Sequence, residues 1–361
     1  MKILVINCGS SSIKYKLYSF PKRRLIAGGL VEKVGQNGSD IKSHKEGVEA
    51  IIAKLIDEKV VRDLKEIVAV GHRVVHGGET FCVPHLVDKA VIKKMKECAE
   101  LAPLHNPANL AGIIACKEFF PSIAHVAVFD TSFHQSIPKH AYMYALPIEY
   151  YKKYGIRRYG FHGASHQFVA HQCARILKKP YNKLKLITCH LGNGCSITAI
   201  NKGKSVDTSM GFTPLEGLVM GTRSGDIDPA VAFYIMEKEN LSYHEMDEIL
   251  NRKSGLVGIS GVSNDMRDIV NGAKKGHKRC KLALDIFIYR IKKYIGAYHL
   301  ILGGADAICF TGGIGENNKQ MISGIKKDIS KAIKTKVLVV PTDEELMIAN
   351  LTFKLIESDK Q

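Results

Sequence analysis

The feature that most constrains the fold is a strand–turn–strand pattern that occurs twice. The first copy, residues 1–17, has four consecutive apolar residues, a polar turn at 7–12, and then apolar residues at every second position. The second copy lies at 186–200, about half a chain later, with a glycine-rich turn at 192–194. One such pattern is typical of an ordinary hairpin, whereas two of them indicate a duplicated domain.

The polar turn of the first copy has the chemistry of a phosphate-binding loop. Between Asn7 and Lys14 the chain offers an amide, a glycine, three hydroxyls and an ammonium group. Backbone N–H groups, hydroxyls and an ammonium that converge at a strand end satisfy the oxygens of a phosphate. Together with the duplication, this chemistry predicts a nucleotide bound between two related halves.

The length and composition favour a globular protein of more than one domain. A chain of 361 residues predicts two or three domains, and 45% hydrophobic residues are sufficient for substantial cores. No apolar run is long enough to cross a bilayer, and the first residues lack the pattern of a signal peptide. We therefore expect no membrane partner. Without a secretory signal, the nine cysteines, which include no C-x-x-C pair, predict reduced thiols and a cytoplasmic location.

The net charge of +17 raises the question of nucleic-acid binding. The lysines are spread along predicted surface helices and loops, in short runs such as 274–275 and 326–327, and no nucleic-acid-binding motif accompanies them. We therefore expect solvated basic faces and no nucleic-acid partner, with a bias toward anionic small substrates.

Strand and helix patterns alternate along the chain, which predicts an α/β fold. The expected elements are a helix at 46–57, a strand at 68–70 entering a glycine turn at 71–78, a strand at 124–129 ending at Asp130, a helix from the N-cap Ser165 to about 177, a long helix at 282–302 stopped by Gly303 and Gly304, and a strand at 307–310 followed by a glycine-rich segment at 311–317 that opens another helix. No Pro-rich or Ser-rich linker separates these elements, so we expect closely apposed domains with a cleft between them.

Three glycine-rich turns at strand ends, 7–12, 190–196 and 312–317, are candidates for ligand binding. In open α/β sheets, ligands collect at the carboxyl ends of strands. No Walker A loop occurs, and neither 192–194 nor 313–315 has the third glycine of a Rossmann fingerprint. Each turn alone is better explained as a tight turn, but together they favour phosphates held by backbone amides.

Two arginines stand in glycine-bounded segments and are candidates for binding anions. Arg73 lies within 71–78, and Arg223 lies within 221–229. A guanidinium is a planar fork that matches phosphoryl and carboxylate oxygens in pairs. The alternative for each arginine is a structural ion pair.

The histidines at 162, 166 and 171 have a spacing that resembles a metal site. There is no H-E-x-x-H motif, and His166 and His171 fall on a predicted helix, so packing explains them better than zinc does. His162 stands in a glycine turn and is a candidate donor to phosphate oxygens.

Three carboxylates complete the candidate site. Asp130 ends a buried strand, and Glu344 and Glu345 follow a predicted strand at 337–340. A carboxylate at a strand end that faces phosphates suits Mg²⁺, which takes one or two carboxylates with phosphate oxygens and water. For Glu345, a favourable charge at a helix N-terminus is the preferred interpretation.

A set of motifs now identifies the family that the chain resembles. The motifs are Asn-Cys-Gly-Ser-Ser-Ser-Ile-Lys at 7–14, Gly-His-Arg-Val-Val-His-Gly-Gly at 71–78, Leu-Ala-Pro-Leu-His-Asn-Pro at 101–107, Phe-Asp-Thr-Ser-Phe-His at 129–134, Arg-Tyr-Gly-Phe-His-Gly at 158–163, His-Leu-Gly-Asn-Gly at 190–194, Gly-Thr-Arg-Ser-Gly-Asp at 221–226, Gly-Gly-Ile-Gly-Glu-Asn at 312–317 and Thr-Asp-Glu-Glu-Leu at 342–346. In number and order they resemble the acetate kinase family, from residue 1 to about residue 350.

The resemblance implies a fold and an activity. The fold is the duplicated two-domain α/β fold of acetate and sugar kinases, Hsp70 and actin, which is ribonuclease H-like and has an interdomain nucleotide cleft. It implies an N-terminal acyl-kinase domain of residues 1–132 plus 345–361 and a C-terminal nucleotide-binding domain of residues 133–344. The activity is reversible in-line phosphoryl transfer from ATP to acetate, giving acetyl phosphate and ADP, with Mg²⁺ or alternatively Mn²⁺. It also implies a homodimer and a place in acetyl-CoA biosynthesis.

The resemblance assigns site residues by position. The catalytic set is Asp130, His162 and Arg223. Substrate binding is assigned to Arg73, with Val75, Leu104, Phe161 and Pro214 as an apolar pocket for the acyl methyl group. Nucleotide binding is assigned to Lys14, His190, Leu191, Gly192, Asn193, Gly194, Asp265, Met266, Arg267, Gly313, Ile314, Gly315, Glu316 and Asn317. The metal ligands are Asn7 and Glu344.

The chemistry of such a reaction is mainly positioning and charge neutralisation. A carboxylate substrate is already ionised and needs no general base, so we expect Asp130 to hold Mg²⁺ and to align an arginine. Two regions are shorter than is usual in the family, 18–68 and 318–337, and neither carries a matched catalytic motif.

Two alternatives stay open at this point. The first is a kinase for propionate or butyrate, because an apolar pocket discriminates one methylene by only about 1–3 kcal/mol. The second is a non-catalytic protein that uses ATP to move domains. The acyl-side residues Arg73 and Asp130 argue against the second alternative, since a chaperone has no use for them.

Overall fold

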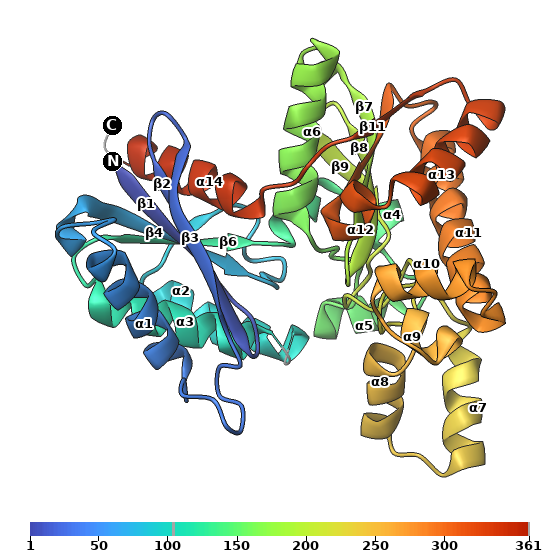
Figure 1. The fold of residues 1–361 in the computed structure, drawn as a ribbon, viewed down its shortest axis with the longest axis horizontal. Helices are drawn as coiled ribbons and strands as arrows, with labels where there is room; N and C mark the ends of the chain where they lie inside the picture. Colours follow the sequence, from blue (N-terminus) through green and yellow to red (C-terminus); the bar gives the residue numbers. More distant parts are fainter. Residues whose placement is uncertain (103–104, 360–361) are drawn as a thin grey trace. The chain divides into compact units, whose positions relative to one another are not determined.

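Two mixed β-sheets form the framework of the structure, a computed structural model that describes residues 1–102 and 105–359 (Figure 1). Each sheet belongs to its own unit of the chain. Unit 1 contains Met1–Gln135, Gly163–Ser165 and the chain from Asp343 onward, and unit 2 contains Ser136–His162 and His166–Thr342.

Unit 1 is a sheet covered by helices on both faces. Its strands are β1 (Lys2–Cys8), β2 (Ser12–Ser19), β3 (Arg24–Glu32), β4 (Ile67–Val74), β5 (His85–Leu86) and β6 (Ala124–Phe129), in the order β3-β2-β1-β4-β6-β5. Strands β1 to β3 are antiparallel neighbours, and β4 and β6 continue the sheet parallel to β1. Helices α1 (His44–Asp57), α2 (Lys89–Glu97) and α3 (Asn106–Phe119) lie on one face, and α14 (Glu344–Ser358) lies on the other (Figure 1).

Unit 2 repeats this strand arrangement. Its strands are β7 (Lys185–Leu191), β8 (Cys195–Asn201), β9 (Lys204–Thr208), β10 (Ala307–Thr311) and β11 (Lys336–Val339), in the order β11-β10-β7-β8-β9. Strands β7 to β9 are antiparallel neighbours, and β10 and β11 run parallel to β7. The order matches β6-β4-β1-β2-β3 of unit 1, which confirms the predicted duplication.

The helices of unit 2 include one on each side of its sheet, α6 and α11 (Figure 1). The helices are α4 (Lys139–Tyr142), α5 (Ile148–Tyr154), α6 (Gly163–Leu177, whose first three residues belong to unit 1), α7 (Pro229–Glu239), α8 (Tyr243–Arg252), α9 (Gly255–Ser260), α10 (Met266–Lys274), α11 (Lys278–Ile301), α12 (Gly312–Asn317) and α13 (Lys319–Ala332). Across residues 1–102 and 105–359, no helix has the length and apolar character that crossing a membrane requires.

Several predicted elements are confirmed, but the strand predicted at 68–70 is longer in the structure. Strand β4 continues through Gly71 to Val74, so Arg73 lies on a strand and not on the predicted loop. A Cβ atom on Gly71 would lie 2.5 Å from Oγ1 of Thr352 on α14. The glycine therefore serves the close approach of a helix and not a turn, a distinction that depends on tertiary contact.

The start of α6 also differs from the prediction. The helix begins at Gly163 with His162 at the N-cap position, whereas Ser165 is buried in its first turn. The Gly163 N–H donates to the Asp130 carbonyl at 3.1 Å, and a Cβ atom on Gly163 would lie 2.2 Å from that oxygen. Contact with a strand end distant in sequence therefore sets the helix start, so the predicted cap at Ser165 is wrong.

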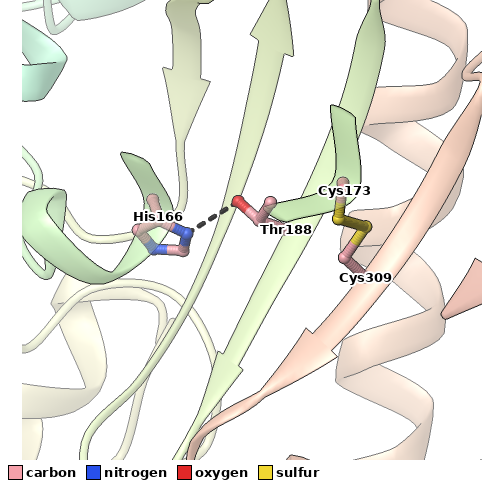
Figure 2. The surroundings of a disulfide bond; sticks show 4 residues. All are labelled: His166, Cys173, Thr188 and Cys309. Carbon is pink, nitrogen blue, oxygen red and sulfur yellow. Dashed lines mark hydrogen bonds between the residues drawn. A yellow bond between two sulfur atoms is a disulfide. The ribbon is translucent and has the colours of Figure 1, made fainter. Parts of the chain in front are cut away.

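One pair of cysteines lies close enough together to be assigned as a disulfide. Cys173 of α6 meets Cys309 of β10, beside the hydrogen bond between His166 and Thr188 (Figure 2). The two cysteines are separated by 136 residues, so their proximity comes from the packing of α6 on the sheet. Their Cα atoms are 7.4 Å apart, which is longer than the usual span of a disulfide, so reduced thiols stay the prediction for this pair, and the seven other cysteines are free.

A buried histidine pair joins the neighbouring strands β4 and β6 of unit 1. His72 Nε2 and His125 Nδ1 are 3.0 Å apart, and His125 Nε2 lies 2.9 Å from the Phe120 carbonyl oxygen. Burial lowers the pKa of His72 well below its ordinary value, and the neighbouring His125 lowers it further. Burial also lowers the pKa of His125 to about 4. Both rings are therefore neutral in the folded protein at neutral pH.

We predict that this pair makes the protein acid-sensitive. Unfolded histidines take up protons below about pH 6.5, whereas the folded pair resists protonation down to about pH 4, so stability is full above pH 6.5 and falls below it. Urea unfolding between pH 7.5 and 4.5 should show a loss of up to about 1.4 kcal/mol per pH unit for each histidine. The variant His72→Leu/His125→Leu should have a shallower slope. Equal slopes in the two proteins would contradict this account.

Candidate functional site

The candidate site of unit 1 lies at the carboxyl ends of parallel strands, where Arg73 meets Asp130. Arg73 is next to the last residue of β4, and Asp130 directly follows β6. Arg73 Nη2 donates to Asp130 Oδ2 at 2.7 Å, and Nε lies 3.1 Å from Oδ1. A longer contact of 3.3 Å joins Nη1 to Asn7 Oδ1. The side-by-side pairing orients the guanidinium plane.

The charges around this arginine offset its burial. Burial disfavours the charged guanidinium, but the carboxylates of Asp130 and Glu344 more than compensate, so the pKa of Arg73 is raised. Burial raises the pKa of Glu344 to about 7, although Arg73 acts in the opposite direction. Within the residues that the structure describes, the Glu344 side chain accepts no hydrogen bond. The Glu344 carboxyl group therefore interacts with Arg73 through charge alone, and no hydrogen bond within the described residues uses its oxygens.

Lys14 was predicted to contact a phosphate, and in the structure it also forms an ion pair with a protein carboxylate. Its Nζ lies 2.9 Å from Oε1 of Glu345, which is buried. The neighbouring Lys16 lies 2.7 Å from Oδ1 of Asp343, the residue that caps α14. These ion pairs tie β2 to the first turn of α14 on either side of Glu344. Glu345 thus combines its predicted place at a helix N-terminus with an ion pair to the half-exposed Lys14.

Two asparagines outside the predicted site residues hold the loop after β4. Asn109 Oδ1 accepts from the Val75 N–H at 3.0 Å, and its Nδ2 donates to the Cys8 carbonyl. Asn106 bonds both the N–H and the carbonyl of His76. Both asparagines lie on α3 and are buried. The Asn-Pro start of that helix was visible in the sequence, but its contacts with the backbone of Cys8, Val75 and His76 were not.

The candidate site of unit 2 is built around the turn between β7 and β8. The Gly221 N–H donates to the Asn193 carbonyl at 3.0 Å, and a Cβ atom on Gly221 would lie 2.1 Å from Asn193 Oδ1. Asn264 Nδ2 donates to the same side-chain oxygen at 3.1 Å. This packing brings the segment that carries Arg223 against the turn at 192–194.

Arg223 differs from Arg73 in having no acidic partner in the part of the chain that the structure describes. Its Nη1 lies 3.3 Å from the Pro214 carbonyl oxygen and 3.8 Å from Met220 Sδ. Among the described residues, no carboxylate lies within ion-pair distance of it. Burial lowers the pKa of Arg223, yet a guanidinium remains charged at neutral pH. A half-buried cation without an anion is the expected mark of a site that binds one.

His162 lies next to this arginine. A Cβ atom placed on Gly194 would be 3.4 Å from His162 Nε2 and 3.5 Å from Arg223 Nη1, so both side chains border the same point. The His162 ring stacks on His190 at a centroid distance of 4.4 Å. Its backbone has a φ of 57°, a left-handed conformation that is uncommon outside glycine. Such a conformation is frequent at functional sites.

The third glycine-rich turn, between β10 and α12, is held by Glu316. Its Oε1 accepts from the N–H groups of Gly312 at 2.9 Å and Thr342 at 3.1 Å. Gly312 has a φ of 79°, and a Cβ atom there would lie 2.6 Å from the Leu191 carbonyl oxygen. Asn317 Nδ2 donates to the Gly313 carbonyl. The predicted nucleotide residues Gly313, Ile314, Gly315, Glu316 and Asn317 thus form one short helix beside β7.

The other predicted positions have varied surroundings. Asp265 caps α10 and pairs with Arg267, which lowers the pKa of Asp265 to about 2, whereas Met266 is buried. Of the predicted apolar residues, Val75 belongs to unit 1, and Phe161 and Pro214 belong to unit 2. Leu104 lies outside the described residues.

A metal ion at this site would depend on few protein carboxylates. In residues 1–102 and 105–359, no group of three or more His, Cys, Asp or Glu side chains is arranged to hold a metal. Mg²⁺ commonly takes one or two carboxylates and completes its shell with phosphate oxygens and water. The predicted ligands Asn7 and Glu344 supply oxygen atoms of that kind.

Comparison with known proteins identifies close relatives. The sequence model of the Acetokinase family matches residues 2–334. The chain is 52% identical to an acetate kinase of Halothermothrix orenii over 398 aligned positions, covering 99% of this chain and all of that protein. A crystal structure of Porphyromonas gingivalis acetate kinase superposes with a TM-score of 0.93 at 45% identity, covering 98% of this chain and 99% of that one. A propionate kinase from Francisella tularensis has the same TM-score at 41% identity, with the same coverage.

The alignment also bears on chain length. Its 398 positions exceed the 361 residues of this chain, so this chain has gaps relative to the H. orenii protein. The predicted shortening at 18–68 and 318–337 stays a prediction, because the alignment length does not locate the gaps.

We predict that Gly163 is needed to place Asp130. Gly163→Ala would bring a Cβ atom to 2.2 Å from the Asp130 carbonyl oxygen, so the free energy of unfolding should fall by about 1–3 kcal/mol. The matched control is Gly296→Ala within α11, where nothing lies within 4 Å of the added Cβ. That variant should be neutral or more stable by about 0.5–1 kcal/mol. Urea denaturation of both proteins checks the prediction, which equal stabilities would disprove.

Proposed function

Because this chain belongs to the acetokinase family, we propose that it catalyses reversible, in-line transfer of a phosphoryl group from ATP to acetate, giving acetyl phosphate and ADP. The reaction moves a charged group between two anions that repel each other. Such a reaction needs positive charge and orientation more than covalent chemistry. The proposed site residues supply these two requirements.

The observation that carries the proposal is the half-buried Arg223, which has no acidic partner in the described part of the chain and borders the same point as His162. A phosphoryl group would supply the missing negative charge. Arg223 would then neutralise charge that develops during transfer, and His162 would donate a hydrogen bond to an oxygen of the same group. The backbone of the turn at 192–194 would bind the nucleotide phosphates.

Arg73 is proposed to bind the carboxylate of the acyl substrate. Asp130 holds the guanidinium plane through two parallel contacts, which supports an orienting role for this aspartate. A base is not required, since the acceptor oxygen of acetate is already ionised. Val75, Leu104, Phe161 and Pro214 are proposed to contact the acyl methyl group.

Mg²⁺ fits the oxygen groups beside Arg73. The Glu344 carboxylate is half-buried, accepts no hydrogen bond within the described residues, and has a pKa raised by burial to about 7, so a cation would be a suitable counterion. Glu344 and Asn7 would hold the ion, with Mn²⁺ as the alternative. When bound, it would supply positive charge to phosphate oxygens.

The remaining assignments extend this proposal. Lys14, His190 and Leu191, the turn at 192–194, Asp265 to Arg267 and Gly313 to Asn317 are proposed nucleotide contacts. A homodimer, a cytoplasmic location and a role in acetyl-CoA biosynthesis are proposed from the family. The functional domains are proposed as 1–132 with 345–361 for the acyl substrate and 133–344 for the nucleotide.

The proposal is tested by a direct product assay. Purified protein with acetate, Mg²⁺ and ATP should yield acetyl phosphate, which hydroxylamine converts to a coloured hydroxamate. A non-catalytic nucleotide-binding protein would give no product above a control without enzyme, and that result would refute the proposal.

A second candidate substrate is propionate, because a propionate kinase structure matches this chain as well as an acetate kinase structure does. We predict that kcat/KM is higher for acetate than for propionate or butyrate. Each methylene is worth only about 1–3 kcal/mol in an apolar pocket, or about 10–200-fold. Initial rates over a concentration series of the three acids measure this preference, and a reversed order would assign the enzyme to the longer acid.

We predict that Arg223→Ala lowers kcat by about 100-fold or more, since the loss of one charge-stabilising donor costs about 2.7–4 kcal/mol. Arg252→Ala, at an exposed arginine near the end of α8, is the matched control and should retain normal turnover. Steady-state kinetics with both variants checks this expectation. Near-normal turnover of Arg223→Ala would show that the arginine has another role.

A further inference from the structure

Behind His162, a chain of buried side chains runs into the core of unit 2. His162 Nδ1 lies 2.8 Å from Ser196 Oγ, and that oxygen lies 2.7 Å from His166 Nε2. His166 Nδ1 in turn lies 2.7 Å from Thr188 Oγ1, a contact that Figure 2 shows. Ser196, His166 and Thr188 are all fully buried.

Thr188 shows which groups donate and which accept in this series of hydrogen bonds. A buried hydroxyl must give its hydrogen to an acceptor. Within residues 1–102 and 105–359, the acceptor that lies in reach of Thr188 Oγ1 is His166 Nδ1. Thr188 therefore donates to His166. Because its Nδ1 accepts, His166 is neutral and carries its hydrogen on Nε2.

The remaining links follow from the count of hydrogens. His166 Nε2–H donates to Ser196 Oγ, so the single hydroxyl hydrogen of Ser196 is left for His162 Nδ1. His162 accepts at Nδ1 and must carry its own hydrogen on Nε2. That nitrogen borders the same point as the Arg223 guanidinium.

We propose that Thr188, His166 and Ser196 are positioning residues that hold His162 as a neutral imidazole with its hydrogen on Nε2. This inference rests on the proposed function, in which His162 donates to the transferring phosphoryl group. A neutral ring suits its neighbours, because a second positive charge beside Arg223 would be unfavourable. A donor fixed in advance costs no reorganisation during the reaction.

The tautomer can be observed directly. Full-length protein labelled with ¹³C and ¹⁵N in its histidine rings gives NMR shifts that distinguish hydrogen on Nε2, on Nδ1 or on both, and His162→Gln assigns the signal. At pH 7.5 the His162 ring should carry its hydrogen on Nε2. Hydrogen on Nδ1, or a doubly protonated ring, would overturn the proposal. This readout does not require activity, so it stands even if the protein makes no acyl phosphate.

The second test is the kinetics of a variant at Thr188, which reaches His162 only through His166 and Ser196. Thr188→Val keeps the shape of the side chain but removes the donor to His166, so the His162 tautomer should become mixed. The rate constant kcat should fall about 10–100-fold, by analogy with the loss of an outer partner of a metal-bound histidine. Thr188→Ser retains the hydroxyl and should recover most of the rate. KM for acetate should change little in either variant.

The matched control is Thr198→Val on the neighbouring strand. Thr198 is also fully buried, and its hydroxyl bonds Thr208 Oγ1 at 2.9 Å, outside the chain that ends at His162. This variant should leave the tautomer and kcat unchanged. If Thr188→Val and Thr198→Val have the same kcat and the same His162 spectrum, Thr188 is only a structural residue and the proposal is wrong.

Discussion

A guanidinium that leaves water is stabilised by a neighbouring anion, and the two units differ in the partners that they give their arginine. In unit 1, Asp130 and Glu344 provide that charge to Arg73, and the parallel contacts with Asp130 fix the plane of the fork. In unit 2, Arg223 contacts a carbonyl oxygen and a sulfur atom. The first arginine is therefore oriented by an anionic partner, while the second has no carboxylate within ion-pair distance among the residues that the structure describes.

The duplicated topology places both arginines near polar turns. Strands β4 and β6 run parallel to β1, so Arg73, Asp130 and the turn after β1 meet at one edge of the sheet. In unit 2, the turn after β7 occupies the position that the turn after β1 has in unit 1, and the segment of Arg223 packs against it. The same strand order thus provides one polar edge in each unit. The two edges differ in the charged residues that the sequence places at them.

The supporting residues lie inside the fold. Asn109 joins the loop after β4 to the end of β1, and Ser196 joins His162 to His166. A buried polar group must have its partners, so each of these side chains restricts the groups that it contacts. The precision of the candidate site therefore depends on residues that do not face a ligand.

The sequence by itself determined the α/β class, the duplication, most strands and helices, and the residue types that suit phosphoryl transfer. Periodic apolar patterns, glycine turns and charged side chains are local features, and local features can be read along the chain. Only the tertiary structure decided that Gly71 admits α14, that Asp130 sets the start of α6, and that Cys173 meets Cys309. It also decided that Arg73 is paired with a carboxylate and that, across 1–102 and 105–359, Arg223 is not. These outcomes depend on contacts between residues far apart in sequence, and a one-dimensional pattern carries no distances of that kind.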